Sequence, residues 1–326
     1  GLISQAASDT TTSINKVTTA VSSASGTAQQ AVSNMQSVTD SNARLIEKLV
    51  DTFGDERKVT INELRAQEDP ELQEVADFVY QNVFLYYTQK QWGLTPEEVD
   101  PSVTARVPVF ISRDNRYFQD AFQGMPVDGY TRLFENLLGH EKITVCLSTE
   151  AESVFDLVFA GREEDAPLEA IHIKGVPFAG PIVYTGPLDE LFLGRFGRLP
   201  YRSLDFVYET FDETYHLPCG TVNYTVTEDY TRITEFKWLT EQTGDKTTIM
   251  REYSRAYEDP ATQIPYYAII NDDNDALYAR YRRLTDALPN FHPLGRLAEY
   301  RYFNMDKVVA DALAASEKIL TETADA

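Results

Sequence analysis

The stretch SLDFVYETFD, residues 203–212, has the composition of a β-strand, because aromatic and aliphatic residues recur in it and turn residues follow it. Similar segments lie on both sides of it, between about residues 143 and 270: KITVCLS, IHIKGV, PIVYTG, TVNYTVT, TRITEFKWL and TTIMREYS. We therefore predict a sheet-rich region in the middle of the chain.

Helices are predicted before and after this region. The first covers residues 70–92, with Asp69 as N-cap and Pro70 at the first helical position. Others are predicted over residues 128–139, closed by Gly139, and over residues 273–288. The order of elements predicts a mixed α+β or α/β fold.

The segment GRLAEYRYFNMD, residues 295–306, alternates large apolar residues with polar ones and precedes a helical pattern over residues 307–320. We expect a turn there from a strand into a helix. The free N–H groups at such a helix start suit an anionic ligand.

The N-terminal part differs from the rest of the chain. Apolar or small residues recur at alternating intervals of three and four from Ile14 to Leu49, which is a heptad repeat. The repeat predicts a long helix that ends at Gly54, pairs with copies of itself, and has its register fixed by Asn42. The alternative is a disordered linker, because Gly26 and many β-branched residues weaken helix propensity.

Composition excludes several classes of protein. The net charge of -22 argues against nucleic acid as a partner. We expect no membrane span, no signal peptide and a cytoplasmic location. The scattered histidines predict no metal site, and Cys146 and Cys219 are expected to be reduced and mostly buried. No paired carboxylates and no nucleophile with a partner histidine occur, so an enzyme of this sequence would rely on a cofactor.

Arginines stand near aromatic residues at several turns. Arginine forks bind phosphate in bidentate fashion, and aromatic rings stack on a base or sugar, so the recurrence favours a nucleotide-like anion. Each pair alone is more often a surface ion pair or a core aromatic. Trp92, at a predicted helix end, either fills the core or walls a pocket. The candidates are Arg106, Tyr117, Phe118, Arg202, Arg232, Tyr266, Tyr267, Arg296 and Tyr302.

Several long motifs resemble the bacterial UDP-galactopyranose mutase family over about residues 60–320. They include YTQKQWGLTPEEVDPSVTARVPVFISRDNRYFQDAFQGMPVDGYTRLFENLL, YTGPLDELFLGRFGRLPYRSLDFVYET, VNYTVTEDYTRITEF, REYS, PYY and GRLAEYRYFNMD. The resemblance implies an isomerase that interconverts UDP-galactopyranose and UDP-galactofuranose for surface-glycan synthesis. N5 of reduced FAD would attack the anomeric carbon and displace UDP.

The resemblance also implies roles for single residues. Arg106 and Arg232 would form the catalytic clamp on the leaving UDP, and Asn223 would touch the sugar. Trp92 would line a mobile loop. The diphosphate would be bound by Arg106, Arg232, Tyr267, Arg296 and Tyr302, the uridine by Tyr87, Tyr117 and Phe118, and the flavin by Arg202, Arg296, Asn304 and Met305. Because the family often has Asp at the position of Asn304, modestly weaker flavin binding is expected.

The expected fold is an FAD/NAD(P)-binding-like domain that lacks its N-terminal Rossmann strands and GxGxxG turn, with a helical insertion domain and an antiparallel sheet domain. Apolar surface would then be exposed. The expected domains are a heptad segment, a helical substrate-loop domain, a mixed-sheet region with the rest of the cofactor domain, and a tail, at residues 1–57, 58–142, 143–320 and 321–326.

Two other hypotheses stay open. The chain could be a non-catalytic homo-oligomeric module, with a fibre-type stem and a domain that binds a nucleotide sugar or glycan. It could also be a chimeric reading frame that folds poorly. Flavin retention separates the mutase from the binding module, and low solubility with protease sensitivity would favour the chimera.

Overall fold

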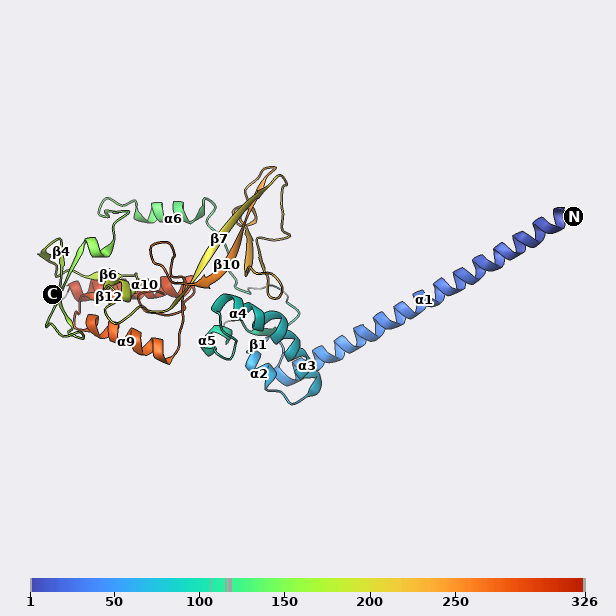
Figure 1. Cartoon of the computed structure of the whole chain (residues 1–326), viewed down its shortest axis with the longest axis horizontal. Helices are drawn as coiled ribbons and strands as arrows, with labels where there is room; N and C mark the ends of the chain where they lie inside the picture. Colours follow the sequence, from blue (N-terminus) through green and yellow to red (C-terminus); the bar gives the residue numbers. More distant parts are fainter. Residues whose placement is uncertain (1, 106, 115, 117–118, 325–326) are drawn as a thin grey trace. The chain divides into compact units, whose positions relative to one another are not determined.

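The computed structural model describes residues 2–105, 107–114, 116 and 119–324 (Figure 1). The chain forms two compact units. Unit 1 consists of Gly1–Asp77 and Pro108–Tyr117, and unit 2 of Phe78–Val107 and Phe118–Ala326. The domain boundaries expected from the sequence at residues 57, 142 and 320 stay predictions.

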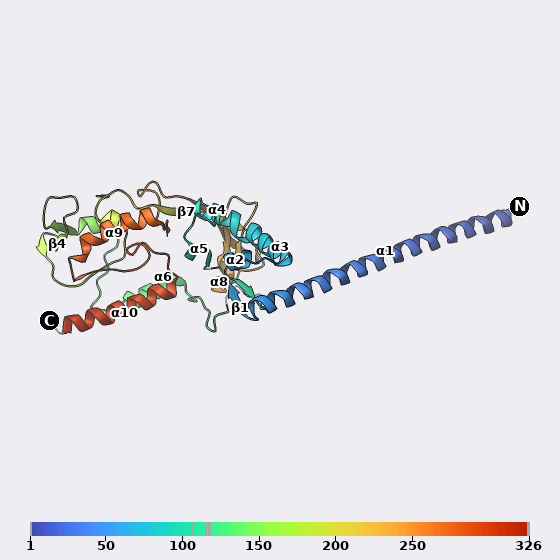
Figure 2. The same cartoon turned by 90° about the horizontal axis from the view of Figure 1, so that it is seen from below.

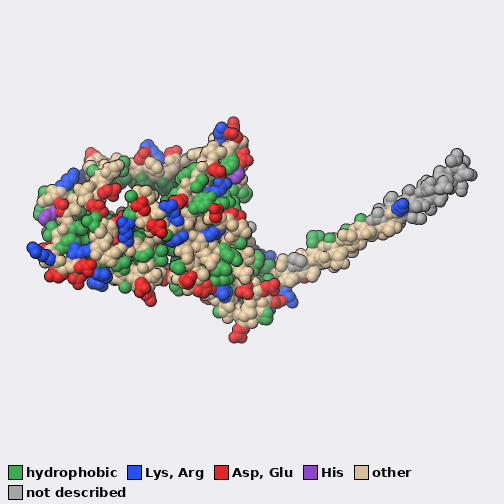
Figure 3. All heavy atoms as spheres, viewed as in Figure 1, with side chains coloured by type: hydrophobic (Ala, Val, Ile, Leu, Met, Phe, Trp, Pro, Cys, Tyr) green, Lys and Arg blue, Asp and Glu red, His purple; other side chains and the backbone are tan. Residues whose placement is uncertain are grey.

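Unit 1 begins with one long helix, α1 (Leu2–Phe53), of 52 residues. It passes through Gly26 without a break and ends at Gly54, whose φ of +93° suits glycine. Uncharged polar side chains predominate on its described part (Figure 3). The predicted helix is therefore confirmed and the disordered linker is wrong. Pairing of the helix with copies of itself stays a prediction.

A small fold follows α1 in unit 1. Strand β1 (Arg57–Val59) pairs antiparallel with β2 (Val109–Ile111), and α2 (Ile61–Arg65) begins with a capping box. Helix α3 (Pro70–Val79) starts as predicted, because Oδ1 of Asp69 accepts the N–H groups of Glu71 and Leu72. Lys48 of α1 binds the Asp69 and Glu71 carboxylates at 2.7 and 2.6 Å.

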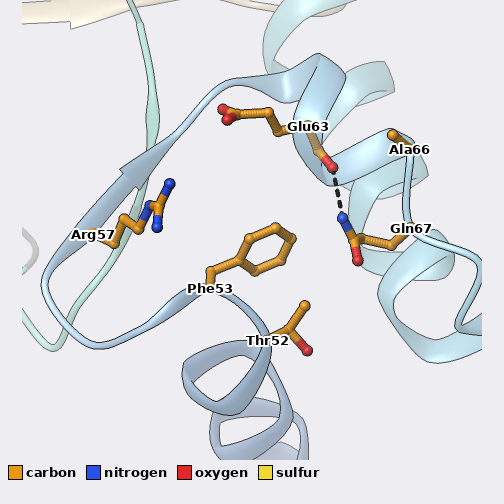
Figure 4. A pocket seen from close by; sticks show the side chains of 6 residues that line it. All are labelled: Thr52, Phe53, Arg57, Glu63, Ala66 and Gln67. Atoms are coloured by element: carbon orange, nitrogen blue, oxygen red, sulfur yellow. Dashed lines mark hydrogen bonds between the residues drawn. The ribbon is translucent and has the colours of Figure 1, made fainter.

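A cavity of about 310 Å³ lies at the end of α1 in unit 1 (Figure 4). Glu63 on its wall is already used by the cap of α2, since its carboxylate accepts the Thr60 N–H at 2.7 Å. We therefore interpret the cavity as loose packing around Phe53 and not as a site of chemistry. It is lined by Thr52, Phe53, Arg57, Glu63, Ala66 and Gln67.

The largest sheet of unit 2 has five strands in the order β11-β7-β10-β9-β8, and every neighbouring pair is antiparallel. Helix α4 (Tyr86–Trp92) lies beside β10 of this sheet (Figures 1 and 2). A π-helical turn, η1 (Tyr80–Leu85), leads into α4. The strands are β7 (Tyr201–Phe211), β8 (Thr221–Asn223), β9 (Arg232–Glu235), β10 (Thr247–Ala256) and β11 (Tyr267–Ala268).

The rest of unit 2 is mixed. An antiparallel sheet holds β3 (Phe155–Phe159), β4 (Leu168–Ile173) and β5 (Val176–Pro177), and β6 (Ile182–Tyr184) runs parallel to β12 (Phe291–Pro293). The remaining elements are α5 (Pro101–Ala105), α6 (Gly129–Leu138), η2 (Ala151–Ser153), α7 (Leu188–Leu191), α8 (Phe236–Thr240), α9 (Asp272–Asp286) and α10 (Met305–Ala324). The mixed α/β class, the antiparallel sheet and the helices near 128–139, 273–288 and 307–320 are as predicted.

Buried tyrosines hold the main core of unit 2 together. Tyr201, Tyr281 and Tyr300 are at most 2% exposed. The Tyr300 hydroxyl donates to the carbonyls of Pro200 (2.6 Å) and Ile269 (3.0 Å), so its polar tip is satisfied inside the core. These bonds fix the turn at residues 295–300 against β7, just before Tyr302.

Several local predictions are wrong. Residues 142–148 form no strand, because they have no strand to pair with among the described residues, and Leu147 is 83% exposed. Residues 236–239 are helix α8, not the end of a strand. Residues 295–300 are turns, so a turn and not a strand precedes α10. Both cysteines are free, as expected, but both are exposed.

Helix α6 leaves its apolar side uncovered. None of its residues is buried, and Phe134 and Leu137 are 56% and 62% exposed. Phe122, in the segment that precedes α6, is 96% exposed. Helix α6 therefore presents apolar surface to solvent in unit 2, whereas the apolar surface expected where the Rossmann strands are missing stays a prediction.

Candidate active site

Three rings form an aromatic cluster in unit 2: Trp92, Tyr267 and Tyr302. Trp92 ends α4, next to Gly93 with its φ of +72°, and is only 7% exposed. Its ring centroid lies 5.6 Å from that of Tyr267 and 5.8 Å from that of Tyr302. The two tyrosine rings are 5.4 Å apart. Trp92 is thus buried in packing and at the same time forms a wall behind the two tyrosines.

The guanidinium group of Arg296 lies over this cluster. Its central carbon is 5.2 Å from the Tyr267 ring centroid and 4.7 Å from that of Tyr302, which is cation–π geometry. Its Nε and Nη2 atoms are buried donors and have no hydrogen-bond partner among the described residues. Buried donors without partners are rare and costly, so these two atoms are suited to bind an anion such as a phosphate.

Arg232, the first residue of β9, is held by groups from three other elements. Its Nε donates to Oδ1 of Asn223 at 2.9 Å, and Nη2 lies 3.5 Å from the Tyr87 hydroxyl. Nη1 lies 3.7 Å from the carboxylate of Glu252. Burial lowers the pKa of Arg232, but Tyr87 and Glu252 outweigh burial, so the pKa is raised and the side chain stays charged.

Glu252 is a member of this site that the sequence did not single out. It lies directly opposite Arg232 in the pairing of β10 with β9 and is 8% exposed. Burial raises its pKa, and the nearby Arg232 limits the rise. The motif REYS contains Glu252, but sequence spacing alone does not distinguish this glutamate from the many surface carboxylates.

Tyr267 is a buried hydroxyl donor with the Arg296 guanidinium group over its ring. Burial raises the pKa of Tyr267 to about 12, although the charges of Arg232 and Arg296 oppose the rise. The hydroxyl therefore stays protonated at neutral pH and can donate a hydrogen bond. A cation and a neutral donor at one ring suit an anionic ligand.

Arg202 has a different environment from the other arginines. Its Nε donates to the Gln91 carbonyl at 2.9 Å, and its Nη2 lies within 3.3 Å of the Lys90 carbonyl and the Ser254 hydroxyl. Arg202 therefore binds the carbonyl groups at the C-terminal end of α4. Burial lowers its pKa.

The other predicted site residues lie elsewhere or cannot be placed. Asn304 and Met305 are exposed at the start of α10. Arg106, Tyr117 and Phe118 lie outside the described residues. In short, the structure brings Tyr87, Asn223 and Arg232 together at one place and Trp92, Tyr267, Arg296 and Tyr302 at another.

Among the described residues, the His, Cys, Asp and Glu side chains form no group that could hold a metal ion. No helix in this part of the chain combines the length and the apolar character needed to cross a bilayer.

A family model and curated relatives of known name agree on the family that this chain resembles. The family model for UDP-galactopyranose mutase matches residues 82–302. The chain is 34% identical to a UDP-galactopyranose mutase of Mycoplasma pneumoniae over 277 residues, which cover 82% of this chain and 66% of the relative. It is 33% identical to a dTDP-fucopyranose mutase of Escherichia coli, over 83% of this chain and 67% of the relative.

A solved structure of reduced UDP-galactopyranose mutase is also similar, with 16% identity, a TM-score of 0.44, and coverage of 81% of this chain and 67% of that one. The chain spans about two thirds of the length of the curated relatives it matches. The match to the family model covers the five-stranded sheet, Trp92, Arg232 and Arg296. The chain therefore belongs to the UDP-galactopyranose mutase family.

Proposed function

We propose that the chain binds UDP-galactose and takes part in its interconversion between the pyranose and furanose forms, as an FAD-dependent isomerase. The observation that carries this proposal is the pair of buried Arg296 donors without a partner, in a guanidinium group that lies over the rings of Tyr267 and Tyr302. A diphosphate would supply the missing acceptors. The named family of the relatives supports galactose as the sugar.

In this proposal the diphosphate lies between the Arg232 and Arg296 guanidinium groups, with hydroxyls of Tyr267 and Tyr302 as further donors. Arg232 and Arg106 stabilise the charge that develops on UDP as it leaves the sugar. Tyr87, Tyr117 and Phe118 hold the uridine, and Asn223 contacts the sugar. Trp92 supports the two tyrosines from behind, because its ring contacts both.

FAD, when bound in its reduced form, would supply the nucleophile for the anomeric carbon. Arg296 carries a positive charge that would favour a reduced flavin nearby, and Asn304 and Met305 are accessible at the start of α10. We therefore propose these three residues as contacts for the flavin. Arg202 fits less directly, because its donors already bind α4 carbonyls, so we propose that it acts by holding that helix end.

The proposal specifies a nucleoside diphosphate sugar as the substrate, but other sugars and bases of this class are also candidates. One relative is named a dTDP-fucopyranose mutase, so a related nucleoside diphosphate sugar is a second candidate substrate.

The long helix α1 favours a second candidate function, an oligomeric module that binds nucleotide sugars without catalysis. We further propose that α1 pairs with copies of itself. The free, exposed cysteines support a reducing compartment such as the cytoplasm.

The test uses the whole purified chain. We expect UDP to bind in calorimetry. After addition of FAD, a flavin absorbance band should stay with the protein through gel filtration and should bleach when dithionite reduces the flavin. Conversion of UDP-galactofuranose to UDP-galactopyranose would then be assayed by chromatography. UDP binding without retained flavin would favour the non-catalytic module. Absence of UDP binding would refute the proposed site.

A further inference from the structure

Lys90, on α4, binds three backbone carbonyl groups of one loop. Its ammonium nitrogen lies 2.5 Å from the Tyr224 carbonyl oxygen, 3.0 Å from that of Glu228 and 3.3 Å from that of Tyr230. An ammonium group has three protons, so these contacts can use its whole donor capacity. All three carbonyls belong to residues 224–231, the loop between β8 and β9.

The two ends of this loop are members of the candidate active site. Asn223 ends β8 and Arg232 begins β9, and the two residues pair directly across the strands. The loop is closed at its base, because the Tyr224 N–H donates to the Thr231 carbonyl at 3.0 Å. The Thr231 N–H in turn donates to the Glu252 carbonyl at 2.8 Å. A shift of the loop would therefore move the pair that carries the Arg232 cation.

Helix α4 gives Lys90 a fixed base and also carries Tyr87, three residues earlier and thus on a neighbouring part of the helix surface. The Gln91 carbonyl accepts from both Arg202 (2.9 Å) and the Ser254 hydroxyl (2.7 Å), which ties the helix end to β7 and β10. Lys90 thus joins two parts that meet at Arg232: the helix with Tyr87 and the loop that follows Asn223.

We propose that Lys90 is a positioning residue, which holds the β8–β9 loop on α4 and so fixes the Arg232 guanidinium between Asn223 and Tyr87 for binding of a nucleoside diphosphate. This inference rests on the proposed function of the site. The positive charge matters, because carbonyl oxygens accept more strongly from an ammonium group than from a neutral donor. Burial lowers the pKa of Lys90, and the carboxylates of Glu228 and Asp229 in the loop limit this decrease.

The chain offers a matched control in Lys237. Its ammonium also binds three backbone carbonyls, those of Thr214 (2.9 Å), Gly244 (2.5 Å) and Lys246 (3.0 Å). It lies in α8, after β9, and none of its partners is in the candidate site. Lys90→Met and Lys237→Met therefore remove the same kind of interaction, an ammonium group on a helix that binds three backbone carbonyls of loops. Only the first substitution is expected to weaken UDP binding, by about tenfold.

Two measurements on the whole chain test the proposal. Calorimetry with UDP should give a raised Kd for Lys90→Met, an intermediate one for Lys90→Gln, and no change for Lys237→Met. In Lys90→Met, the added substitution Asn223→Ala should cost less affinity than it does in the unsubstituted chain, because the two residues act on the same arginine. Equal Kd values for Lys90→Met and Lys237→Met, or additive losses, would overturn the proposal.

Hydrogen exchange of the amides of residues 224–231 provides a readout that needs no ligand. Exchange should be faster in Lys90→Met and unchanged in Lys237→Met. If the unsubstituted chain fails to bind UDP but this contrast appears, the proposed function is wrong and the role of Lys90 in holding the loop stands. If exchange is the same in both variants, Lys90 does not hold the loop, whatever the affinity for UDP.

Discussion

Nε of Arg232 donates a 2.9 Å hydrogen bond to Oδ1 of Asn223, its direct neighbour across two antiparallel strands. The bond fixes the plane of the guanidinium group by one nitrogen and leaves the other two near Tyr87 and Glu252. The cation is therefore oriented before any ligand arrives. Such preorganisation lowers the entropy cost of binding.

Replacement of Arg232 should remove UDP binding without unfolding the chain. We expect Arg232→Ala to raise the Kd for UDP at least about 30-fold, because a charged hydrogen-bond donor to phosphate is lost. Isothermal titration calorimetry and circular dichroism would measure affinity and fold. Arg255→Ala is the control, since Arg255 pairs with Asp205 on the exposed face of the same sheet. Equal affinity of the two variants would contradict the proposed clamp.

Replacement of Arg296 should separate stability from binding. Arg296→Met removes two buried donors that have no partner, which offsets the loss of its cation–π contacts. We expect a free energy of unfolding within about 1 kcal/mol of the unsubstituted chain. The rise in melting temperature that UDP causes should disappear.

The matched control for this substitution is Arg280→Met. The Arg280 guanidinium also lies over a ring, 4.0 Å from the Phe196 centroid, but it is not part of the candidate site. That variant should keep the full response to UDP. A large loss of stability in Arg296→Met alone would show that Arg296 is mainly a structural residue.

Asp189 predicts a pH dependence of stability. Its side chain is 3% exposed, one of its oxygens has no partner among the described residues, and burial raises its pKa from 3.8 to about 6. Between these two values the folded state binds more protons than the unfolded state, so stability falls as the pH rises from about 4 to about 6. Two pKa units correspond to about 3 kcal/mol.

Asp189→Asn should remove this dependence, because the amide is neutral and its oxygen can still accept the Leu199 N–H. The variant should match the unsubstituted chain near pH 4 and be more stable by about 2–3 kcal/mol at pH 7. Urea unfolding at several pH values would measure the difference. Asp245→Asn, which removes an exposed charge, should show no such trend.

Helix α1 predicts an oligomer that depends on the heptad positions. Met35 lies in the predicted seam and Val32 lies outside it, and both side chains are exposed in the single chain, at 63% and 55%. Met35→Lys should lower the mass in solution, because it places a charge in the seam, whereas Val32→Lys should not. Size-exclusion chromatography with light scattering would show the difference. A monomeric unsubstituted chain would refute the pairing of α1.

The predicted elements that proved right had local signals. Asp69 and Pro70 predicted the start of α3, and Gly139 predicted the end of α6. Recurring apolar and aromatic residues predicted the strand β7. The π-helical turn at Tyr80–Leu85 was not predicted, since its side-chain spacing differs little from that of an α-helix over so short a stretch.

The wrong predictions concern segments whose state depends on distant partners. Residues 142–148 alternate like a strand, but a strand needs a neighbour for its backbone groups. In α8, Lys237 faces inward to bind carbonyl groups, which strand alternation does not foresee. Likewise, the motifs pointed to Arg232 and Arg296, whereas Glu252 and Lys90 became visible only through contacts across the sheet and the loop.

The place of Arg296 over two tyrosine rings affects how the protein should be handled. If the proposed role of its two unpartnered donors is right, phosphate, sulfate or citrate in a purification buffer should compete with UDP and raise the melting temperature by themselves. A zwitterionic buffer with low chloride would leave these donors open. In such a buffer, a rise in melting temperature in a thermal-shift screen would be caused by the added ligand and not by buffer anions.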